Sequence, residues 1–295
     1  MPHWAFTAIG TQWAIDIFEP LSGATAKTLR RQVTQRIEVF DAHYSRFRPD
    51  SWISQIATQT GRFTLPADAK PLFDLYQELY NATDGKMTPL IGQVLVDAGY
   101  DATYSLQPKA IHPARRWEDT LIYNYPHVEM LQPALLDMGA IGKGYLVDIV
   151  AGILLDHKIT SFCIDAGGDM LHRSKDTHLL EVGLEDPNDA TRAIGVVHLG
   201  NQSLCGSAGS YRKWDTFHHI IDPVKLVSPT HIQAVWVTAE STRLADALTT
   251  ALFFVSPEQL AQYTFEYALI YADRSLVHSP HFPATFFTTQ KELAA

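Results

Sequence analysis

The sequence predicts an α+β fold, built as one compact unit of two interlocked α/β subdomains. Segments with the two-residue alternation of strands and segments with the three- and four-residue periodicity of helices follow one another along the chain. Their order is strand, helix, helix, then strand, helix, strands, then strand, helix, strand. No linker rich in Pro, Gly or Ser separates these blocks, and no internal repeat stands out. We therefore expect residues 1–295 to form a single domain.

The first block predicts a hairpin followed by a long helix. Residues 6–9 and 13–17 form two alternating runs, and Gly10 supplies the bend between them. A helix is expected from Thr25, as its N-cap, to Phe47. Its apolar stripe consists of Leu29, Val33, Ile37, Phe40 and Tyr44.

The later elements follow from the same two periodicities. A second helix is expected over about 67–83, ending at Asp84-Gly85, and a third over 142–157 directly after a short strand at 136–140. Further strands are expected at 161–165, 179–184, 194–199, 231–238 and 268–272, with a helix at 240–255. The long stretches 86–134 and 200–230 read as irregular, and we expect the functional residues to gather there.

Composition excludes several classes of protein. With 46% hydrophobic and 19% charged residues the chain can bury a large core, and a net charge of −9 argues against nucleic-acid binding. A small phosphate ligand remains compatible with that charge, since local groups or a cation can neutralise it. Cys163 and Cys205 have no disulfide or metal-ligand spacing. No segment is apolar enough to cross a bilayer, so the chain as given is expected to be cytoplasmic, or exported or lipid-anchored if a leader was trimmed.

Two segments rich in small residues could approach a ligand closely. In residues 137–145, Gly142 and Gly144 flank Lys143 at an expected helix start, a setting that suits a diphosphate or, alternatively, tight helix packing with a surface lysine. Residues 164–169 place two glycines after a strand, either as a turn against a ligand or as a plain bend.

Asp246 and Thr250 stand four residues apart on one face of the expected helix at 240–255, in an otherwise apolar stretch. A buried carboxylate there needs a cation or a hydrogen-bond network, because an uncompensated buried charge costs several kcal/mol. Two oxygen ligands suit Mg²⁺. The alternative is an exposed Asp beside a Thr whose hydroxyl bonds to its own helix.

His219 stands three residues before Asp222-Pro223, where a strand end could present its imidazole for proton transfer. With 13 histidines in the chain, a purely structural role is the alternative.

Taken in order, these segments resemble the ApbE-type flavin transferases, the FAD:protein FMN transferase family. The matching segments are Ile9-Gly10-Thr11, residues 44–51, 85–92, 137–148, 165–169, 207–211, 219–223 and 245–253. The resemblance covers nearly the whole chain and implies a T-fold-related unit with mixed sheets.

The resemblance further implies a Mg²⁺-dependent cleavage of FAD, in which FMN passes to a Thr or Ser hydroxyl of a target flavoprotein and AMP leaves. The metal would be held by Asp246, Thr250 and the carbonyl of Ala140, and His219 would be the base. Lys143 and amides at the helix start would hold phosphate oxygens. The residues implied to line the flavin or adenosine pocket are Ile9, Phe47, Met87, Thr88, Asp137, Lys143 and Ile221.

The sequence departs from the family pattern beside the implied base. Val224-Lys225-Leu226 replaces the usual Thr-Gly turn after Asp222-Pro223, and Thr88 stands where many members carry Asp. The alternative is therefore an FAD-binding protein, or an FAD pyrophosphatase that yields FMN and AMP, without transfer to an acceptor.

Overall fold

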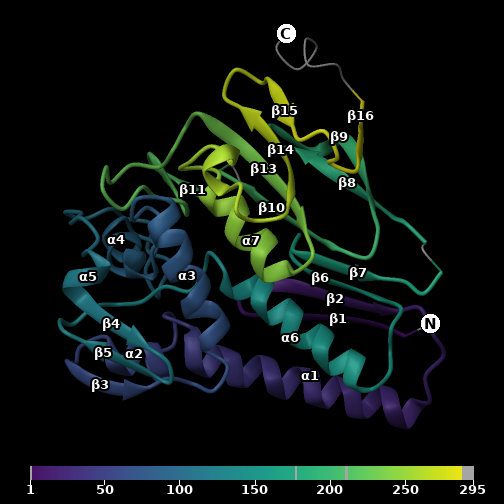
Figure 1. Cartoon of the computed structure of the whole chain (residues 1–295), viewed down its shortest axis with the longest axis horizontal. Helices are drawn as coiled ribbons and strands as arrows, with labels where there is room; N and C mark the ends of the chain where they lie inside the picture. The colour runs from purple at the N-terminus through teal and green to yellow at the C-terminus, as the bar shows by residue number, and fades with distance from the viewer. Residues whose placement is uncertain (1, 177, 210–211, 288–295) are drawn as a thin grey trace.

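The N-terminal hairpin opens the main sheet of the computed structural model, which describes residues 2–176, 178–209 and 212–287 (Figure 1). Strands β1 (His3–Ala8) and β2 (Thr11–Ile17) pair antiparallel. Ile9 and Gly10 form the turn with φ of 43° and 75°. Positive φ at both turn residues gives a twist that matches the flanking strands. The predicted hairpin is confirmed.

Eight strands form the main sheet in the order β1-β2-β6-β7-β10-β13-β14-β15. The added strands are β6 (Phe162–Ala166), β7 (Met170–Arg173), β10 (Ser203–Ala208), β13 (Ile232–Ala239), β14 (Glu266–Tyr271) and β15 (Leu276–His278). The α+β class is confirmed, although neighbouring strands pair antiparallel throughout the described residues, whereas the resemblance implied mixed sheets.

Three helices cover one face of this sheet, as Figure 1 shows: α1 (Gly23–Tyr44), α6 (Gly142–Asp156) and α7 (Thr242–Ala251). The predicted stripe of α1 is buried, but its N-cap is Ser22, not Thr25, because the Ser22 hydroxyl accepts the Thr25 N–H at 3.1 Å. The helix ends at Tyr44 rather than Phe47, since Ser45 is already extended.

The opposite face of the main sheet is covered by a second, three-stranded sheet in the order β16-β9-β8. Its strands are β8 (Leu180–Asp186), β9 (Asp189–Leu199) and β16 (Ala284–Phe286). Successive side chains of β10 point to opposite faces of the main sheet: Leu204 packs with this second sheet, and Cys205 packs with the helices. The two layers therefore sandwich the main sheet.

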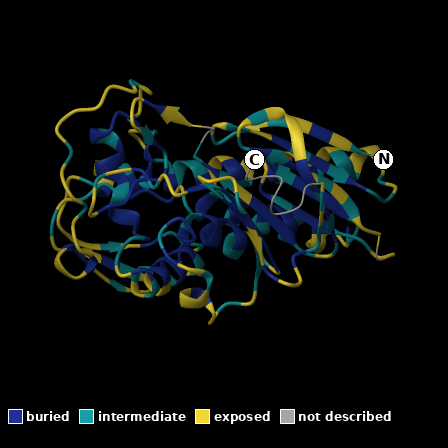
Figure 2. Cartoon of the chain, turned by 90° about the horizontal axis from the view of Figure 1, so that it is seen from above, coloured by how far each residue is buried: buried dark blue, intermediate teal, exposed yellow. Residues whose placement is uncertain are grey.

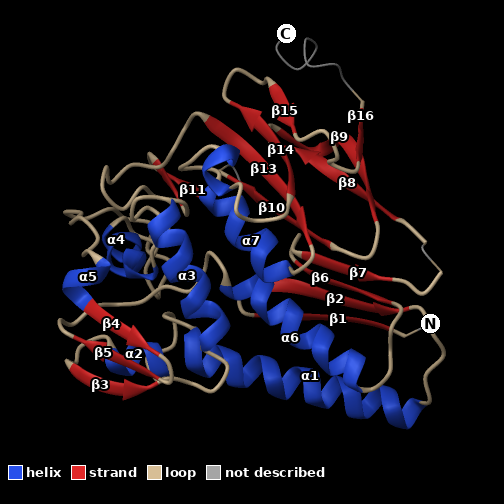
Figure 3. Ribbon diagram, viewed as in Figure 1, coloured by secondary structure: helices blue, strands red, loops and turns tan. Residues whose placement is uncertain are grey.

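A third region lies beyond the end of α1, as Figure 3 shows. It holds the sheet β3-β5-β4 and several short helices. Its elements are α2 (Trp52–Ile56), β3 (Gly61–Thr64), α3 (Lys70–Ala82), η1 (Pro89–Ile91), α4 (Gly92–Asp97), α5 (Trp117–Thr120), β4 (Leu121–Asn124) and β5 (His127–Met130). The remaining elements are β11 (Lys213–Trp214), β12 (Phe217–His218) and η2 (Pro257–Leu260).

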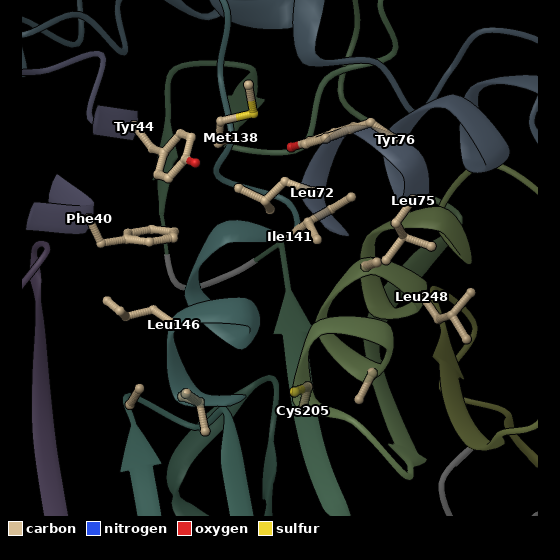
Figure 4. Close-up of a cluster of buried hydrophobic side chains, with 14 of the residues drawn as sticks. Phe40, Tyr44, Leu72, Leu75, Tyr76, Met138, Ile141, Leu146, Cys205 and Leu248 are labelled. Atoms are coloured by element: carbon tan, nitrogen blue, oxygen red, sulfur yellow. The ribbon is translucent and has the colours of Figure 1, made fainter. Parts of the chain in front are cut away.

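One hydrophobic core, running from Trp4 to Leu269, connects the main sheet, its helices and the third region, and buried residues concentrate along it (Figure 2). The second sheet packs on the main sheet through a separate cluster. Figure 4 shows side chains of α1, α3, α6 and α7 meeting in it, among them Phe40, Tyr76 and Leu248. The described residues form a single compact unit, and the single domain over residues 1–295 stays a prediction.

Several expected segments differ from the structure. Residues 136–140 form a loop, not a strand; they are mostly buried because they pass between α3 and α6 rather than because they lie in a sheet. Neither long stretch is wholly irregular, since 86–134 holds α4, α5, β4 and β5 and 200–230 holds the central strand β10. Helix α7 starts at Thr242, with Ser241 as N-cap, and ends at Ala251, rather than spanning 240–255. No described helix has both the length and the apolar character needed to span a membrane.

Candidate functional site

A cavity of about 980 Å³ lies where the helices, the main sheet and the third region meet. The turn between β1 and β2, the end of α1, the start of α6, helix α7, strand β10 and residues 212–221 all contribute to its wall. The predicted site residues lie far apart in the sequence but all line it: Ile9, Phe47, Met87, Thr88, Asp137, Ala140, Lys143, His219, Ile221, Asp246 and Thr250. The fold thus brings them to one place, which is the geometry that a shared site requires.

The close contact between α6 and α7 positions Asp246. A Cβ placed on Gly144 would meet the carbonyl oxygen of Thr242 at 2.3 Å and the Cβ of Asp246 at 2.6 Å, so only glycine fits there. With the helices this close, the Gly144 N–H donates to Asp246 Oδ2 at 2.8 Å. On α6, Asp148 caps the start of α7 by accepting the Thr242 N–H at 2.8 Å and the Arg243 N–H at 2.9 Å. These bonds hold the register between the two helices.

Asp246, Asp169 and Lys143 form a charge cluster beside this contact. Lys143 Nζ pairs with Asp169 Oδ2, and both carboxylates are buried. Burial, together with the charge of Asp169, raises the pKa of Asp246 well above its usual range. The pKa of Lys143 is also raised, because the charges of Asp169 and Asp246 outweigh its own burial. Two acidic side chains thus lie near one ammonium group, which pairs with Asp169, and negative charge is in excess when both are ionised.

The amides at the start of α6 are less available than the resemblance implied. The Gly142 N–H donates to the Met138 carbonyl at 2.7 Å, and the Gly144 N–H is taken by Asp246. The amides of these two glycines are therefore not free to hold phosphate oxygens. Among the described residues, no three or more His, Cys, Asp or Glu side chains gather as a metal-binding group.

Two adjacent histidines at the end of β12 have different surroundings. Both ring nitrogens of His218 are engaged: Nδ1 accepts the Ile220 N–H at 3.2 Å, and Nε2 lies 2.9 Å from the Pro229 carbonyl. His219 lines the cavity, and its Nδ1 has no hydrogen-bond partner among the described residues. Burial, with the charge of Arg212 adding to it, lowers the pKa of His219 to about 3. His219 is therefore neutral near pH 7, and among the described residues it is the one of the two histidines with an unpaired ring nitrogen.

The turn after His219 is closed by Asp222, whose Oδ1 accepts the N–H groups of Val224 at 2.9 Å and Lys225 at 2.8 Å. The Asp222 carbonyl also accepts the Leu226 N–H at 2.9 Å. Leu226 adopts a φ of 59°, a left-handed conformation that favours glycine. The substituted turn is thus intact but strained.

Three of the residues that the resemblance implies for the flavin pocket are held by contacts with their neighbours. Thr88 is buried, and its hydroxyl accepts the Leu90 N–H at 3.1 Å, which caps η1. Phe47 carries the ring of Tyr104 in a parallel stack, with centroids 5.3 Å apart and planes 6° apart. Ile221 packs in the same small cluster as Phe47. Ser210 and Tyr211, the end of one matching segment, lie outside the described residues.

Arg46, which lines the cavity, and Asp169, which lies beside Lys143, were given no role from the sequence, although each pairs with a predicted site residue. Arg46 donates from Nε to Asp137 across 91 positions of sequence, and Asp169 pairs with Lys143 across 26. Both lie inside segments that match the family, and this match is the signal in the sequence that could have pointed to them. Their partners are set by the tertiary fold, so no local pattern could have named the pairs.

The comparisons with known proteins agree on one family. The model of the ApbE family matches residues 9–269. The chain is 26% identical to a curated FAD:protein FMN transferase of Treponema pallidum, over 85% of this chain and 78% of that protein. It is 24% identical to one of Klebsiella pneumoniae, over 88% of this chain and 80% of that protein.

Solved structures share the fold at lower identity. The ApbE protein of Thermotoga maritima superposes with a TM-score of 0.83 at 18% identity, covering 95% of this chain and 97% of that one. The flavin transferase ApbE of Vibrio cholerae gives a TM-score of 0.81 at 19% identity, with the same coverage. The family match over most of the chain, carried by the same fold, shows that this chain belongs to the ApbE family.

Proposed function

We propose that this chain transfers FMN from FAD to a Thr or Ser hydroxyl of a target flavoprotein and releases AMP, in a reaction that depends on Mg²⁺. It is a flavin transferase by family, and its relatives are named FAD:protein FMN transferase. The proposal adds the metal, the kind of acceptor group and the second product.

The observation that carries the proposal is the charge cluster at the cavity wall. Asp246 and Asp169 lie near a single ammonium group, and the raised pKa of Asp246 reflects how poorly its burial tolerates a second negative charge. A divalent cation would relieve this, because its positive charge restores the balance that the protein itself lacks. The same cation would attract a diphosphate into an acidic protein.

The donor set around Asp246 fits Mg²⁺. The Asp246 carboxylate, the Thr250 hydroxyl and the Ala140 carbonyl are all oxygens, they all line the cavity, and Mg²⁺ prefers oxygen ligands. Three protein ligands would leave room for phosphate oxygens and water around the ion. When bound, the ion supplies charge neutralisation to the diphosphate as its bond breaks.

The protein's own groups account for the remaining steps. Lys143 would bind a diphosphate oxygen, and His219 would take the proton of the acceptor hydroxyl. That oxygen then bonds to the phosphorus on the FMN side, the phosphoanhydride bond breaks, and AMP carries away its electron pair. A diphosphate close to His219 raises its affinity for the proton, because the negative charge favours the imidazolium.

The direct test is to incubate the protein with FAD, Mg²⁺ and candidate flavoprotein domains, and to follow fluorescent flavin on the acceptor in a denaturing gel together with AMP. We expect both products in equal amounts. Replacing the acceptor Thr or Ser by Ala should abolish labelling. Production of neither labelled acceptor nor AMP, with any acceptor tried, would contradict the proposal.

The strained turn at Leu226 keeps a second function open, FAD binding or FAD hydrolysis to FMN and AMP without transfer. Under that alternative, AMP and free FMN accumulate at the same rate with or without acceptor, or FAD binds without turnover. Measuring free FMN in the assay above separates the two.

A further inference from the structure

Arg46 places a buried guanidinium with a spare donor at the cavity wall. Its side chain is only 2% exposed, and its Nη2 has no hydrogen-bond partner among the described residues. Leaving such a charged donor unsatisfied costs free energy, because a buried polar group without a partner loses its hydrogen bonds to water and gains none in the protein. Arg46 lines the same cavity as the predicted flavin-pocket residues, so a ligand that reaches Nη2 from the cavity would supply the missing acceptor.

The orientation of Arg46 is fixed through Asp137. The Arg46 Nε donates to Asp137 Oδ2, while Asp137 Oδ1 accepts the Gly139 N–H at 2.7 Å. The backbone of Asp137 is held as well, because its carbonyl accepts the Tyr76 hydroxyl at 3.2 Å and its N–H donates to Pro89 at 2.7 Å. The planar guanidinium is therefore held in place before any ligand arrives, which lowers the entropic cost of binding.

Aromatic rings surround the guanidinium. Its carbon lies 4.2 Å from the ring centroid of Phe47 and 5.0 Å from that of Tyr100. Phe47 carries the parallel ring of Tyr104, which is 52% exposed, so a flat ligand ring that takes the place of this half-exposed side chain would make the same stack. A planar ligand stacked among these rings would bring its polar edge to the guanidinium.

The charge of Arg46 is already balanced by Asp137, in contrast to the charge cluster around Lys143. A balanced ion pair has little net attraction for a diphosphate, whereas its spare N–H suits a neutral acceptor such as a ring carbonyl. The isoalloxazine ring of FAD carries such carbonyls on one edge and is otherwise flat and apolar. It matches both the aromatic wall and the free donor.

We propose that Arg46 Nη2 donates a hydrogen bond to a carbonyl oxygen of the isoalloxazine ring, while that ring lies against the wall formed by Phe47 and Tyr100. This rests on FAD being the substrate, as in the proposed function, and it assigns Arg46 to the flavin rather than to the diphosphate or the adenine.

The test compares binding of FAD and ADP, with Mg²⁺ present, to the wild type and to Arg46→Met and Arg46→Lys by titration calorimetry. ADP contains the adenosine and the diphosphate of FAD but no flavin. We expect both variants to bind FAD about 10- to 100-fold more weakly, the loss typical of a hydrogen bond from a charged group, and ADP within about twofold of the wild type. Arg46→Lys retains the positive charge beside Asp137 but lacks the planar guanidinium. It therefore still tests the hydrogen bond from Nη2 if Arg46→Met does not fold.

Arg36→Met is the matched control. Arg36 also pairs with an aspartate, Asp68, and lies over an aromatic ring, that of Phe40 at 5.9 Å, but it does not line the cavity. FAD affinity should be unchanged in this variant. Unchanged FAD binding in both Arg46 variants, an equal loss for ADP, or an equal loss in Arg36→Met would each overturn the proposal. Flavin transfer is assayed separately. A protein that binds FAD but transfers nothing contradicts the proposed function, and the binding data for the Arg46 variants still decide the role of Arg46.

Discussion

The two walls of the cavity are built in different ways. The wall that holds the charge cluster consists of two packed helices, α6 and α7, where Gly144 leaves no room for a side chain. The wall that holds His219 consists of turns in which Asp215 and Leu226 adopt positive φ. Packing therefore sets the position of Asp246, and a few turn hydrogen bonds set that of His219. Changes in the first wall should affect folding and chemistry together, and changes in the second should affect chemistry with little effect on folding.

The largest effect is expected for Gly144→Ala. The new Cβ would overlap the Thr242 carbonyl, a backbone atom that cannot turn away, so α6 and α7 must separate. We expect a loss of about 3 kcal/mol in unfolding free energy, at the upper end for an overpacked core. Transfer should fall about 100-fold or more, because the site residues on the two helices separate. Denaturant unfolding and the transfer assay measure the two.

Gly152→Ala, on the same helix, is the control, because a Cβ at Gly152 meets nothing within 4 Å. It should stabilise the protein by about 0.5–1 kcal/mol through helix propensity and leave transfer unchanged. Equal stability of the Gly144→Ala and Gly152→Ala variants would show that packing does not set the helix-built wall.

In the helix-built wall, Asp246→Asn is expected to lower transfer without lowering stability. The amide can still accept the Gly144 N–H but cannot supply an anionic ligand, so Mg²⁺-stimulated transfer should fall about 100-fold or more. Without metal the variant should melt at or above the wild-type temperature, because a carboxyl whose pKa burial has raised is destabilising when ionised. Added Mg²⁺ should raise the melting temperature of the wild type alone. Undiminished Mg²⁺ stimulation in the variant would remove Asp246 from the site.

In the turn-built wall, His219→Ala should mainly lower transfer, whereas His218→Ala should mainly lower stability. His219→Ala should lower transfer about 100- to 10,000-fold, the range for a lost general base, with FAD affinity nearly unchanged. His218→Ala removes two hydrogen bonds to Ile220 and Pro229, so it should cost about 1–3 kcal/mol of stability. Transfer per folded molecule should fall less in His218→Ala than in His219→Ala. The reverse order would assign the base to His218.

The lowered pKa of His219 also predicts a pH dependence of stability. In the folded state it titrates near pH 3, against an ordinary value of 6.5. Between these values the unfolded chain binds the proton and the folded chain does not, so stability is full above pH 6.5 and falls on acidification. The wild type should lose up to about 1.4 kcal/mol per pH unit relative to His219→Ala below pH 6.5. Parallel unfolding curves at pH 7, 6 and 5 measure the difference; a constant difference would place the imidazole in water.

The same contrast explains what could be predicted from the sequence. The hairpin, α1 and α6 follow from local periodicity, and the sequence order of the family segments led to Asp246 and His219. The strand β10 was missed, because its sequence, Ser-Leu-Cys-Gly-Ser-Ala, lacks the alternation of a half-buried strand and is buried on both faces by other elements. The pairs of Arg46 with Asp137 and Lys143 with Asp169 depend on contacts between distant segments, which no local pattern contains.

The smallest effect is expected for Leu226→Gly, which introduces a glycine into the turn beside His219. Relief of the left-handed conformation, worth about 1–2 kcal/mol, opposes the loss of the packing of Leu226 against its neighbours, so unfolding free energy should change by less than about 1 kcal/mol. Transfer should stay within about threefold, because Asp222 still closes the turn through the N–H groups of Val224 and Lys225. Val224→Ala is the matched control, since this exposed side chain leaves the backbone untouched. A rise in transfer of more than tenfold in Leu226→Gly alone would mean that the substituted turn holds His219 away from its productive position, and that FAD binding or hydrolysis better describes the chain as it stands.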